Sequence, residues 1–255
     1  MTRASSMFGQ VEKYVLEKIA TEKTIHMTLI DPENFTPEQA SIVAETSKNS
    51  GTAAIMIGGS TFASQGHLDA VVQAIKKTVD LPTILFPNNE RGISRYSDAI
   101  WFMSLLNSTD PYFLVGAQII GAPVIKKFAI EPLPMGYIIV GHGGTVGIVG
   151  KANTIPYDKP EIAVAHALAG QYFGMRFIYL EGGSGVANPV PPEMISAVKN
   201  HIDIPLIVGG GIRTHEQATI AAKAGADIIV TGNLTESVDN KQRIVEIIEG
   251  IKQSN

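Results

Sequence analysis

Three glycine-rich stretches in the second half of the chain have the composition of phosphate-binding loops. Glycine has no Cβ, so backbone N–H groups in such stretches can approach a phosphate dianion closely. Tight turns use glycine as well, but each stretch here follows an apolar run, which favours a shared phosphate site. Ser184 and Asn233 could add side-chain donors. The stretches are Glu181-Gly182-Gly183-Ser184-Gly185, Gly209-Gly210-Gly211-Ile212-Arg213 and Gly232-Asn233.

Asp31 could bind a metal ion, because it directly follows the apolar run IHMTLI. Mg²⁺ takes few protein oxygens and fills its other positions with water and substrate phosphate, so one carboxylate can suffice. Ser60 is the expected second contact, and Thr61 is the alternative. A plain Asp-Pro turn with Pro32 is the structural explanation that competes with a metal site.

Glu181 could act as a general base, since it stands between an apolar run and a glycine stretch. The competing explanation is a carboxylate paired with a nearby Arg or Lys. Tyr179 should face opposite to Leu180 by strand alternation, and either a site or the core could receive it. Six histidines are present without the spacing of a zinc site, and only His142 follows a strand at a position where it could face a ligand.

Short apolar runs alternate with amphipathic helical patterns along the whole chain. Nearly continuous apolar strands indicate burial on both faces, which is typical of a parallel sheet. Eight of them favour a closed (β/α)₈ TIM barrel, whose strands all end at one rim, so the loops and both carboxylates should meet there. The expected strands are 25–30, 53–57, 83–86, 99–102, 137–140, 177–180, 206–208 and 228–231.

Helix signals support this interpretation. Thr36 and Gln39 form a capping box around Pro37, and Thr214 with Gln217 repeats the pattern. Gly225 suits a left-handed helix end, and residues 8–20 predict a helix that covers the barrel floor. The segment 87–98 is too short and broken for a regular helix, so the barrel should be modified by the loss of the helix after strand three.

Composition indicates a single domain, 1–255, of a cytoplasmic protein. The hydrophobic content of 45% supports a large core, and a net charge of −4 without a dense basic block argues against nucleic-acid partners. Cysteine is absent, so disulfides and thiolate chemistry are excluded. There is no apolar leader and no transmembrane segment, although peripheral membrane contact stays open.

Aromatic residues cluster in 101–103 and at Tyr112 and Phe113. Aromatic side chains mostly pack in cores, and the functional alternative is an apolar groove for a long hydrocarbon chain. If these aromatic segments are exposed, they also predict a homo-oligomer.

Six motifs together resemble the geranylgeranylglyceryl phosphate synthase family. They are HMTLIDPEN, IMIGGST, AIWFMSLLNS, YLEGGSG, VGGGIR and VTGN, in this order. The resemblance implies a prenyltransferase that joins a prenyl diphosphate, here expected to be geranylgeranyl diphosphate, to sn-glycerol 1-phosphate with Mg²⁺ in ether-lipid synthesis. It implies Mg²⁺ at Asp31 and Ser60, and Glu181 as base or orienter. Glycerol phosphate would contact Tyr179, Glu181, Gly182, Gly183, Ser184, Gly185, Gly210, Gly211, Gly232 and Asn233.

One part of the chain departs from the family pattern. An acidic residue and a proline precede the glycine pair after strand five in the family, whereas Gly141 and His142 stand here. Two other functions stay open from the residues alone. The first is an isomerase, epimerase or lyase on a phosphate-binding barrel, and the second is a non-catalytic protein that binds a sugar phosphate or a prenyl lipid.

Overall fold

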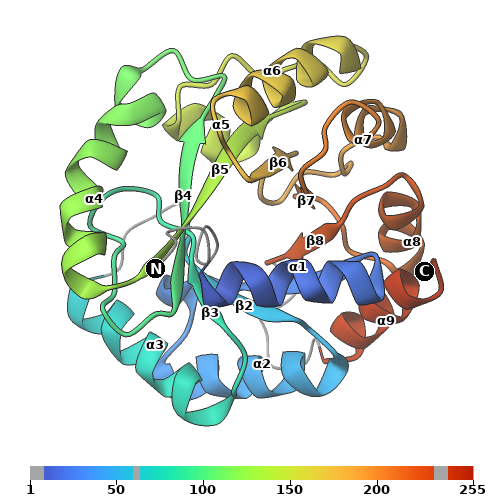
Figure 1. The fold of residues 1–255 in the computed structure, drawn as a ribbon. Coiled ribbons are helices and arrows are strands. Elements are labelled where there is room, and N and C mark those ends of the chain that lie inside the picture. Colours follow the sequence, from blue (N-terminus) through green and yellow to red (C-terminus); the bar gives the residue numbers. More distant parts are fainter. Residues whose placement is uncertain (1–8, 60–63, 233–240, 255) are drawn as a thin grey trace, which may run out of the picture.

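The computed structural model describes residues 9–59, 64–232 and 241–254. Its strands close into one parallel barrel in chain order, so the predicted TIM barrel is confirmed (Figure 1). The strands are β1 Ile25–Ile30, β2 Ala54–Ile57, β3 Thr83–Leu85, β4 Ala99–Leu105, β5 Glu131–Ile139, β6 Phe177–Glu181, β7 Leu206–Gly209 and β8 Ile228–Thr231.

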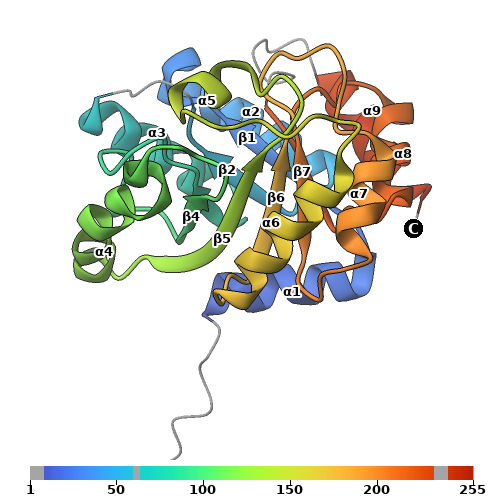
Figure 2. The same ribbon diagram turned by 90° about the horizontal axis from the view of Figure 1, so that it is seen from above.

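Helices form a ring around these strands, and α1 lies across one end of the barrel while α5 lies at the other (Figure 2). The α-helices are α1 Gln10–Glu22, α2 Pro37–Ser50, α3 Gln65–Thr78, α4 Ala117–Phe128, α5 Gly144–Val149, α6 Pro160–Tyr172, α7 Pro192–Lys199, α8 His215–Lys223 and α9 Lys241–Lys252. A 3-10 turn, η1 Pro32–Asn34, and a π-helical turn, η2 Tyr112–Gly116, complete the elements.

The helix after strand three is absent, as predicted, because residues 86–98 between β3 and β4 hold no helix. The two strands pair only at Ile84↔Ala99 and Leu85↔Ile100, although β4 continues to Leu105. The carboxyl half of β4 therefore has no β3 partner. This leaves an opening in the barrel wall next to η2 and α4.

β5 begins six residues earlier than the sequence predicts, at Glu131 instead of Tyr137. Pro132 and Pro134 argued against a strand there, since proline cannot donate a ladder hydrogen bond. β5 tolerates them because β6 joins it only at Met135↔Phe177, so before that point β5 has one neighbour, β4.

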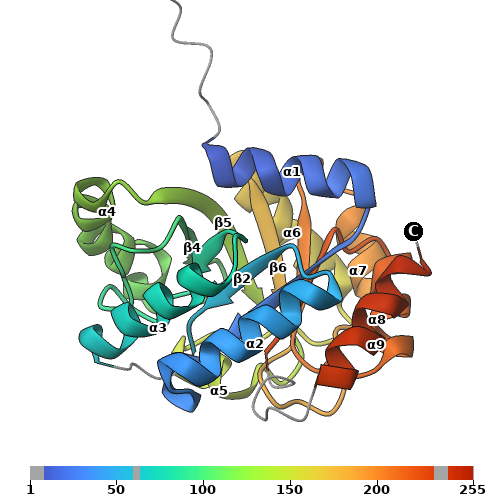
Figure 3. The same ribbon diagram turned by 90° about the horizontal axis from the view of Figure 1, so that it is seen from below.

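Contacts that are distant in sequence hold the floor helix α1. Its N-cap residue, Gly9, has no side chain, and the Glu131 carboxylate of β5 instead accepts the N–H groups of Val11 (2.8 Å) and Glu12 (2.9 Å). Arg176 pairs with the buried Glu12 carboxylate at 2.6 Å. These contacts pin the helix over the floor, and Figure 3 shows it covering that end.

The capping predictions are confirmed at α2 and only in part at α8. Thr36 and Gln39 make both bonds of the capping box. Thr214 accepts the N–H of Gln217, but the Gln217 amide oxygen accepts the N–H of Arg213 at 2.8 Å instead of that of Thr214. Gly225 has the expected left-handed backbone, with φ +104°.

Candidate active site

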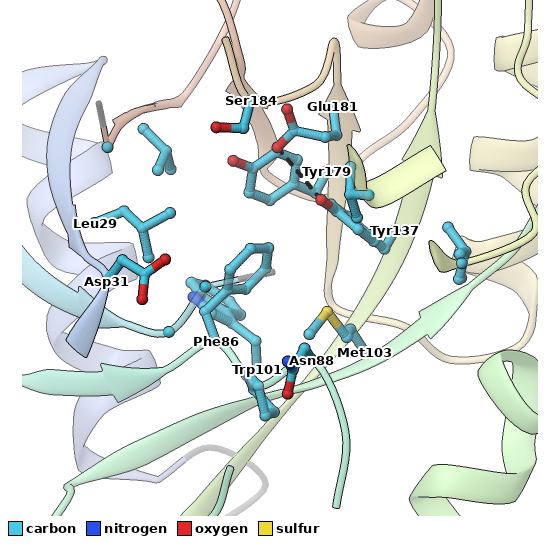
Figure 4. A pocket seen from close by; sticks show the side chains of 18 of the residues that line it. Leu29, Asp31, Phe86, Asn88, Trp101, Met103, Tyr137, Tyr179, Glu181 and Ser184 are labelled. Atoms are coloured by element: carbon cyan, nitrogen blue, oxygen red, sulfur yellow. Dashed lines mark hydrogen bonds between the residues drawn. The ribbon is translucent and has the colours of Figure 1, made fainter. Parts of the chain in front are cut away.

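A cavity of about 240 Å³ opens where the strands end and where most of the predicted site residues meet, although Gly182 and Gly183 do not line it (Figure 4). Its polar part lies under the glycine loops, and its apolar branch passes the opening between β3 and β4 toward α4. The polar lining includes Asp31, Glu181, Ser184, Gly185, Gly210, Gly211 and Gly232. The apolar branch includes Ile93, Phe102, Phe113, Gly121 and Ile125.

The glycine loops need glycine for reasons of both conformation and space. Gly183, Gly185, Gly210 and Gly211 all have left-handed φ angles between +75° and +109°. A Cβ at Gly210 would overlap the Glu181 carboxylate and lie 2.7 Å from the Gly183 nitrogen. The loops after β6 and β7 are thus in direct contact, and their backbones border one space.

Glu181 is buried at the rim with 7% of its surface exposed. Its Oε1 accepts the Gly183 N–H at 2.6 Å and its Oε2 accepts the Tyr137 hydroxyl at 3.3 Å. None of the ion pairs between described residues involves Glu181, so the predicted alternative of a structural ion pair has no support there.

Burial raises the pKa of the Glu181 carboxyl above its usual value. Hydrogen bonds from Gly183, Tyr179 and Tyr137 lower this pKa but do not cancel the effect of burial. A carboxylate of this kind is more basic than an exposed one, and it lies next to the loops expected to hold a phosphorylated substrate.

Aromatic rings from β5, from β6 and from the residue that follows β3 form the cavity floor below Glu181. Tyr137 and Tyr179 meet edge to face at 5.1 Å between ring centroids, and Phe86 lies 5.5 Å from Tyr137 and 5.7 Å from Tyr179. Tyr179 therefore lines the site and packs in the core at once. Sequence reasoning missed Tyr137, although strand alternation from Ile139 places it inward.

Asp31 points into the same cavity from the β1 side (Figure 4). It caps η1, with its Oδ1 accepting the Glu33 N–H at 3.0 Å. A Cβ at Gly59 would overlap its carboxylate, so the backbone just before Ser60 runs against Asp31. Ser60, Thr61 and Asn233 lie outside the described residues.

The surroundings of Asp31 suit a hard cation held mainly by its substrate. Within the described ranges, no cluster of three or more His, Cys, Asp or Glu side chains could enclose a metal. A single carboxylate leaves most coordination positions to water and phosphate oxygens, which fits Mg²⁺ and not zinc.

Arg213 is a lining residue that the sequence reasoning did not single out. Among the described lining residues it carries the one cationic side chain, against three carboxylates at Asp31, Glu90 and Glu181. Its backbone is fixed by the bond to Gln217, and its guanidinium makes no ion pair with a described residue. Its place beside the glycine stretch of β7 was the available signal.

The family departure at Gly141 and His142 has a local explanation. Gly141 has φ +62°, and the Tyr157 ring covers the place that a Cβ would need. Tyr157 donates its hydroxyl to the Asn188 carbonyl at 3.2 Å, so it is held there. His142 is exposed and does not line the cavity.

The aromatic cluster on β4 and η2 serves both roles considered from the sequence. Trp101 is 1% exposed and packs edge to face on Phe177 at 5.1 Å inside the barrel. Phe102, Met103 and Phe113 are half-buried and line the apolar branch.

A closed parallel barrel with glycine loops, a buried carboxylate and an apolar side branch at the strand ends is typical of enzymes with a TIM-barrel fold. The sequence comparison is more specific. The sequence profile of the PcrB family matches residues 17–251, and the chain belongs to this family. Because the relatives described next are geranylgeranylglyceryl phosphate synthases, the resemblance stated from the motifs is confirmed.

Relatives and solved structures agree with this assignment. Geranylgeranylglyceryl phosphate synthase of Thermococcus gammatolerans is 54% identical over 96% of this chain and 98% of its own length, and that of Thermococcus kodakarensis is 55% identical over the same shares. A solved (S)-3-O-geranylgeranylglyceryl phosphate synthase from Thermoplasma acidophilum, in complex with substrate sn-glycerol-1-phosphate, has a TM-score of 0.92 at 44% identity and covers 97% of this chain and 100% of that one. Thiamine phosphate pyrophosphorylase from Pyrococcus furiosus, at 13% identity and TM-score 0.58, covers 92% of this chain and 98% of its own and shares the fold alone. No helix in the described ranges is long and apolar enough to cross a bilayer.

Proposed function

We propose that this protein joins a prenyl diphosphate to the C3 hydroxyl of sn-glycerol 1-phosphate and releases pyrophosphate. The observation that carries the proposal is the position of Glu181, a buried carboxylate between contacting glycine loops and an apolar cavity. The names of the relatives and the substrate bound to the Thermoplasma acidophilum enzyme support it.

The glycine loops bind the phosphate of glycerol phosphate through backbone N–H groups. Arg213 supplies positive charge beside them. The cavity needs this charge because three carboxylates line it and both substrates are anions. This leaves the glycerol hydroxyls to face Glu181. Tyr137 and Gly183 hold that carboxylate in place, so the C3 hydroxyl meets a base of fixed orientation.

The reaction exchanges one C–O bond for another. The C3 oxygen of glycerol phosphate forms a bond to C1 of the prenyl group while the bond from C1 to the diphosphate oxygen breaks. Glu181 accepts the hydroxyl proton, and the pyrophosphate leaves with the bonding electron pair. The apolar floor and branch keep water away from the allylic carbon. Water would otherwise attack this carbon and hydrolyse the prenyl diphosphate.

Asp31, together with Ser60, would hold Mg²⁺, and that ion would neutralise charge on the departing diphosphate. The fit rests on the Asp31 carboxylate at the rim and on the backbone of Gly59 running against it.

The prenyl chain occupies the apolar branch toward α4. At about 0.8 kcal/mol per CH₂, complete burial of a chain of about twenty carbons contributes at most roughly 16 kcal/mol. A branch of this kind is consistent with the expected geranylgeranyl group. The homo-oligomer and the cytoplasmic location stay predictions from the sequence.

Incubation with prenyl diphosphates of several lengths and each enantiomer of glycerol phosphate tests the proposal. Pyrophosphate release should require both substrates, favour sn-glycerol 1-phosphate and stop with excess EDTA. Asp31→Asn should lower turnover by at least roughly a hundredfold and weaken Mn²⁺ binding measured by calorimetry. Release without glycerol phosphate, or none with any pair of substrates, would contradict the proposed reaction and leave a binding protein or another barrel activity.

A further inference from the structure

The outer face of α4 is apolar although it faces solvent. Val115, just before the helix, and Ile119 and Ile120 within it expose 53%, 65% and 53% of their surfaces. The opposite side of the same helix, with Gly121 and Ile125 buried, lines the apolar branch of the cavity. A helix that is apolar on both sides normally has a partner on each.

Basic side chains gather at the end of this outer face. Lys126 and Lys127 follow Ile119 and Ile120 by about two helical turns, so they lie on the same side, and both are exposed. Neither lysine pairs with an acidic residue of the described part. The group is local, since the whole chain carries −4.

We infer that this α4 face, formed by Val115, Ile119, Ile120, Lys126 and Lys127, docks on a membrane surface that carries anionic headgroups. Apolar side chains flanked by lysine and arginine are the composition of helices that lie in a bilayer interface. The inference rests on the proposed function, because a prenyl diphosphate is a substrate that a bilayer holds. Docking places the apolar branch, which lies directly behind α4, next to the bilayer that holds the prenyl diphosphate.

Charge distinguishes a membrane from a second copy of this chain. Residues 111–130 contain no acidic side chain, so the α4 face of a second copy offers no partner to Lys126 and Lys127. An anionic bilayer complements the same residues. Figure 2 shows α4 on the side of the molecule away from α8 and α9, at the outer edge, where a flat surface can reach it.

Vesicle flotation of the full chain tests this inference. The protein should float with vesicles that contain about a third phosphatidylglycerol, less with pure phosphatidylcholine, and less again at high salt. Ile119→Glu with Ile120→Glu should weaken binding at least roughly tenfold. Lys126→Glu with Lys127→Glu should remove the preference for anionic vesicles. Tyr172→Glu with Phe173→Glu, at an even more exposed apolar site at the end of α6, is the control and should float like the wild type.

Turnover separates this inference from the proposed function. The Ile119 and Ile120 double variant should keep wild-type turnover of a short prenyl diphosphate in solution, because neither residue lines the cavity, and should lose turnover of geranylgeranyl diphosphate supplied in vesicles. Absence of turnover in the wild type counts against the proposed function alone. Three outcomes would each overturn docking. In the first, the wild type does not float, and in the second, the double variant floats like the wild type. In the third, light scattering shows a lower mass for the double variant while its flotation is unchanged.

Discussion

At Glu181, burial and hydrogen bonding act on the carboxyl in opposite directions, and burial has the larger effect on its pKa. The ionised form is the one that can accept the hydroxyl proton. Activity should therefore fall as pH decreases through this raised pKa, so the acid limb of the kcat/KM profile should lie above the usual carboxyl value of 4.5.

Substitutions at Glu181 separate a base from an orienting group. If it is the base, Glu181→Gln should lower kcat by roughly two to four orders of magnitude while glycerol phosphate binding changes much less. If departure of the diphosphate limits the rate, Gln should be nearly as good as Glu, and Ala should be poor. Near-native kcat in both variants would leave Glu181 without a catalytic role.

Arg213 should bind the phosphate of glycerol phosphate. Arg213→Gln should raise the KM for glycerol phosphate roughly tenfold or more, because a charge-assisted contact is lost, and should change kcat little. Arg213→Lys should recover part of the loss. Lys223→Gln, an exposed charge on the same α8 region, is the control. If the KM for the prenyl diphosphate rises instead, the guanidinium serves the other substrate.

Among the elements, the short pairing of β3 with β4 has the largest functional consequence. A regular helix after β3 would pack over the opening that the apolar branch uses. The segment 86–98 takes its place, and the hydroxyl of Tyr112 on η2 bonds to Glu90 of this segment. The branch is thus enclosed between that segment and α4.

Gly121 on α4 should set the space at the end of the branch. A Cβ there would lie 3.4 Å from the Ile93 side chain on the other side of the branch. Gly121→Leu should therefore fill the branch while leaving the helix intact. We expect kcat/KM for geranylgeranyl diphosphate to fall at least roughly tenfold and that for a ten-carbon substrate to change little. Gly66→Leu, where a Cβ meets nothing within 4 Å, is the control. Equal losses for both substrates would place the long chain elsewhere.

At the scale of the whole molecule, His26 joins the first strand to the last. It is 2% exposed, hydrogen-bonds with Thr52, and has its Nε2 2.9 Å from the Thr231 hydroxyl. Burial lowers its pKa to about 3 from 6.5. The native barrel therefore holds a neutral imidazole where the unfolded chain takes up a proton.

Stability should consequently depend on this residue in acid. Its contribution is complete above pH 6.5 and is lost as pH falls toward 3, because the unfolded state binds the extra proton. The slope is at most about 1.4 kcal/mol per pH unit. His26→Gln should show a shallower decline in the free energy of unfolding, measured with urea between pH 4 and 7. Identical slopes in the two proteins would mean that protonation of His26 does not lower the free energy of unfolding.

Local chemistry in the sequence was enough to predict the barrel and its rim. Apolar runs marked every strand, the capping box at Thr36 marked a helix, and the broken segment after β3 marked the missing one. Because parallel strands end at one rim, Asp31, Glu181 and the glycine stretches could be placed together before any contact was known. These features depend on neighbours close in the chain.

Contacts between distant segments depended on closure of the barrel and could not be predicted. Tyr137 reaches Glu181 across 44 residues because β5 and β6 pair in one register, and Glu131 caps α1 from 120 residues away. Arg213 became significant only once the cavity showed no other cation among its described lining residues. Strand register and tilt decide which side chains converge, and both result from packing the whole chain, so the tertiary structure alone determined how the site is assembled.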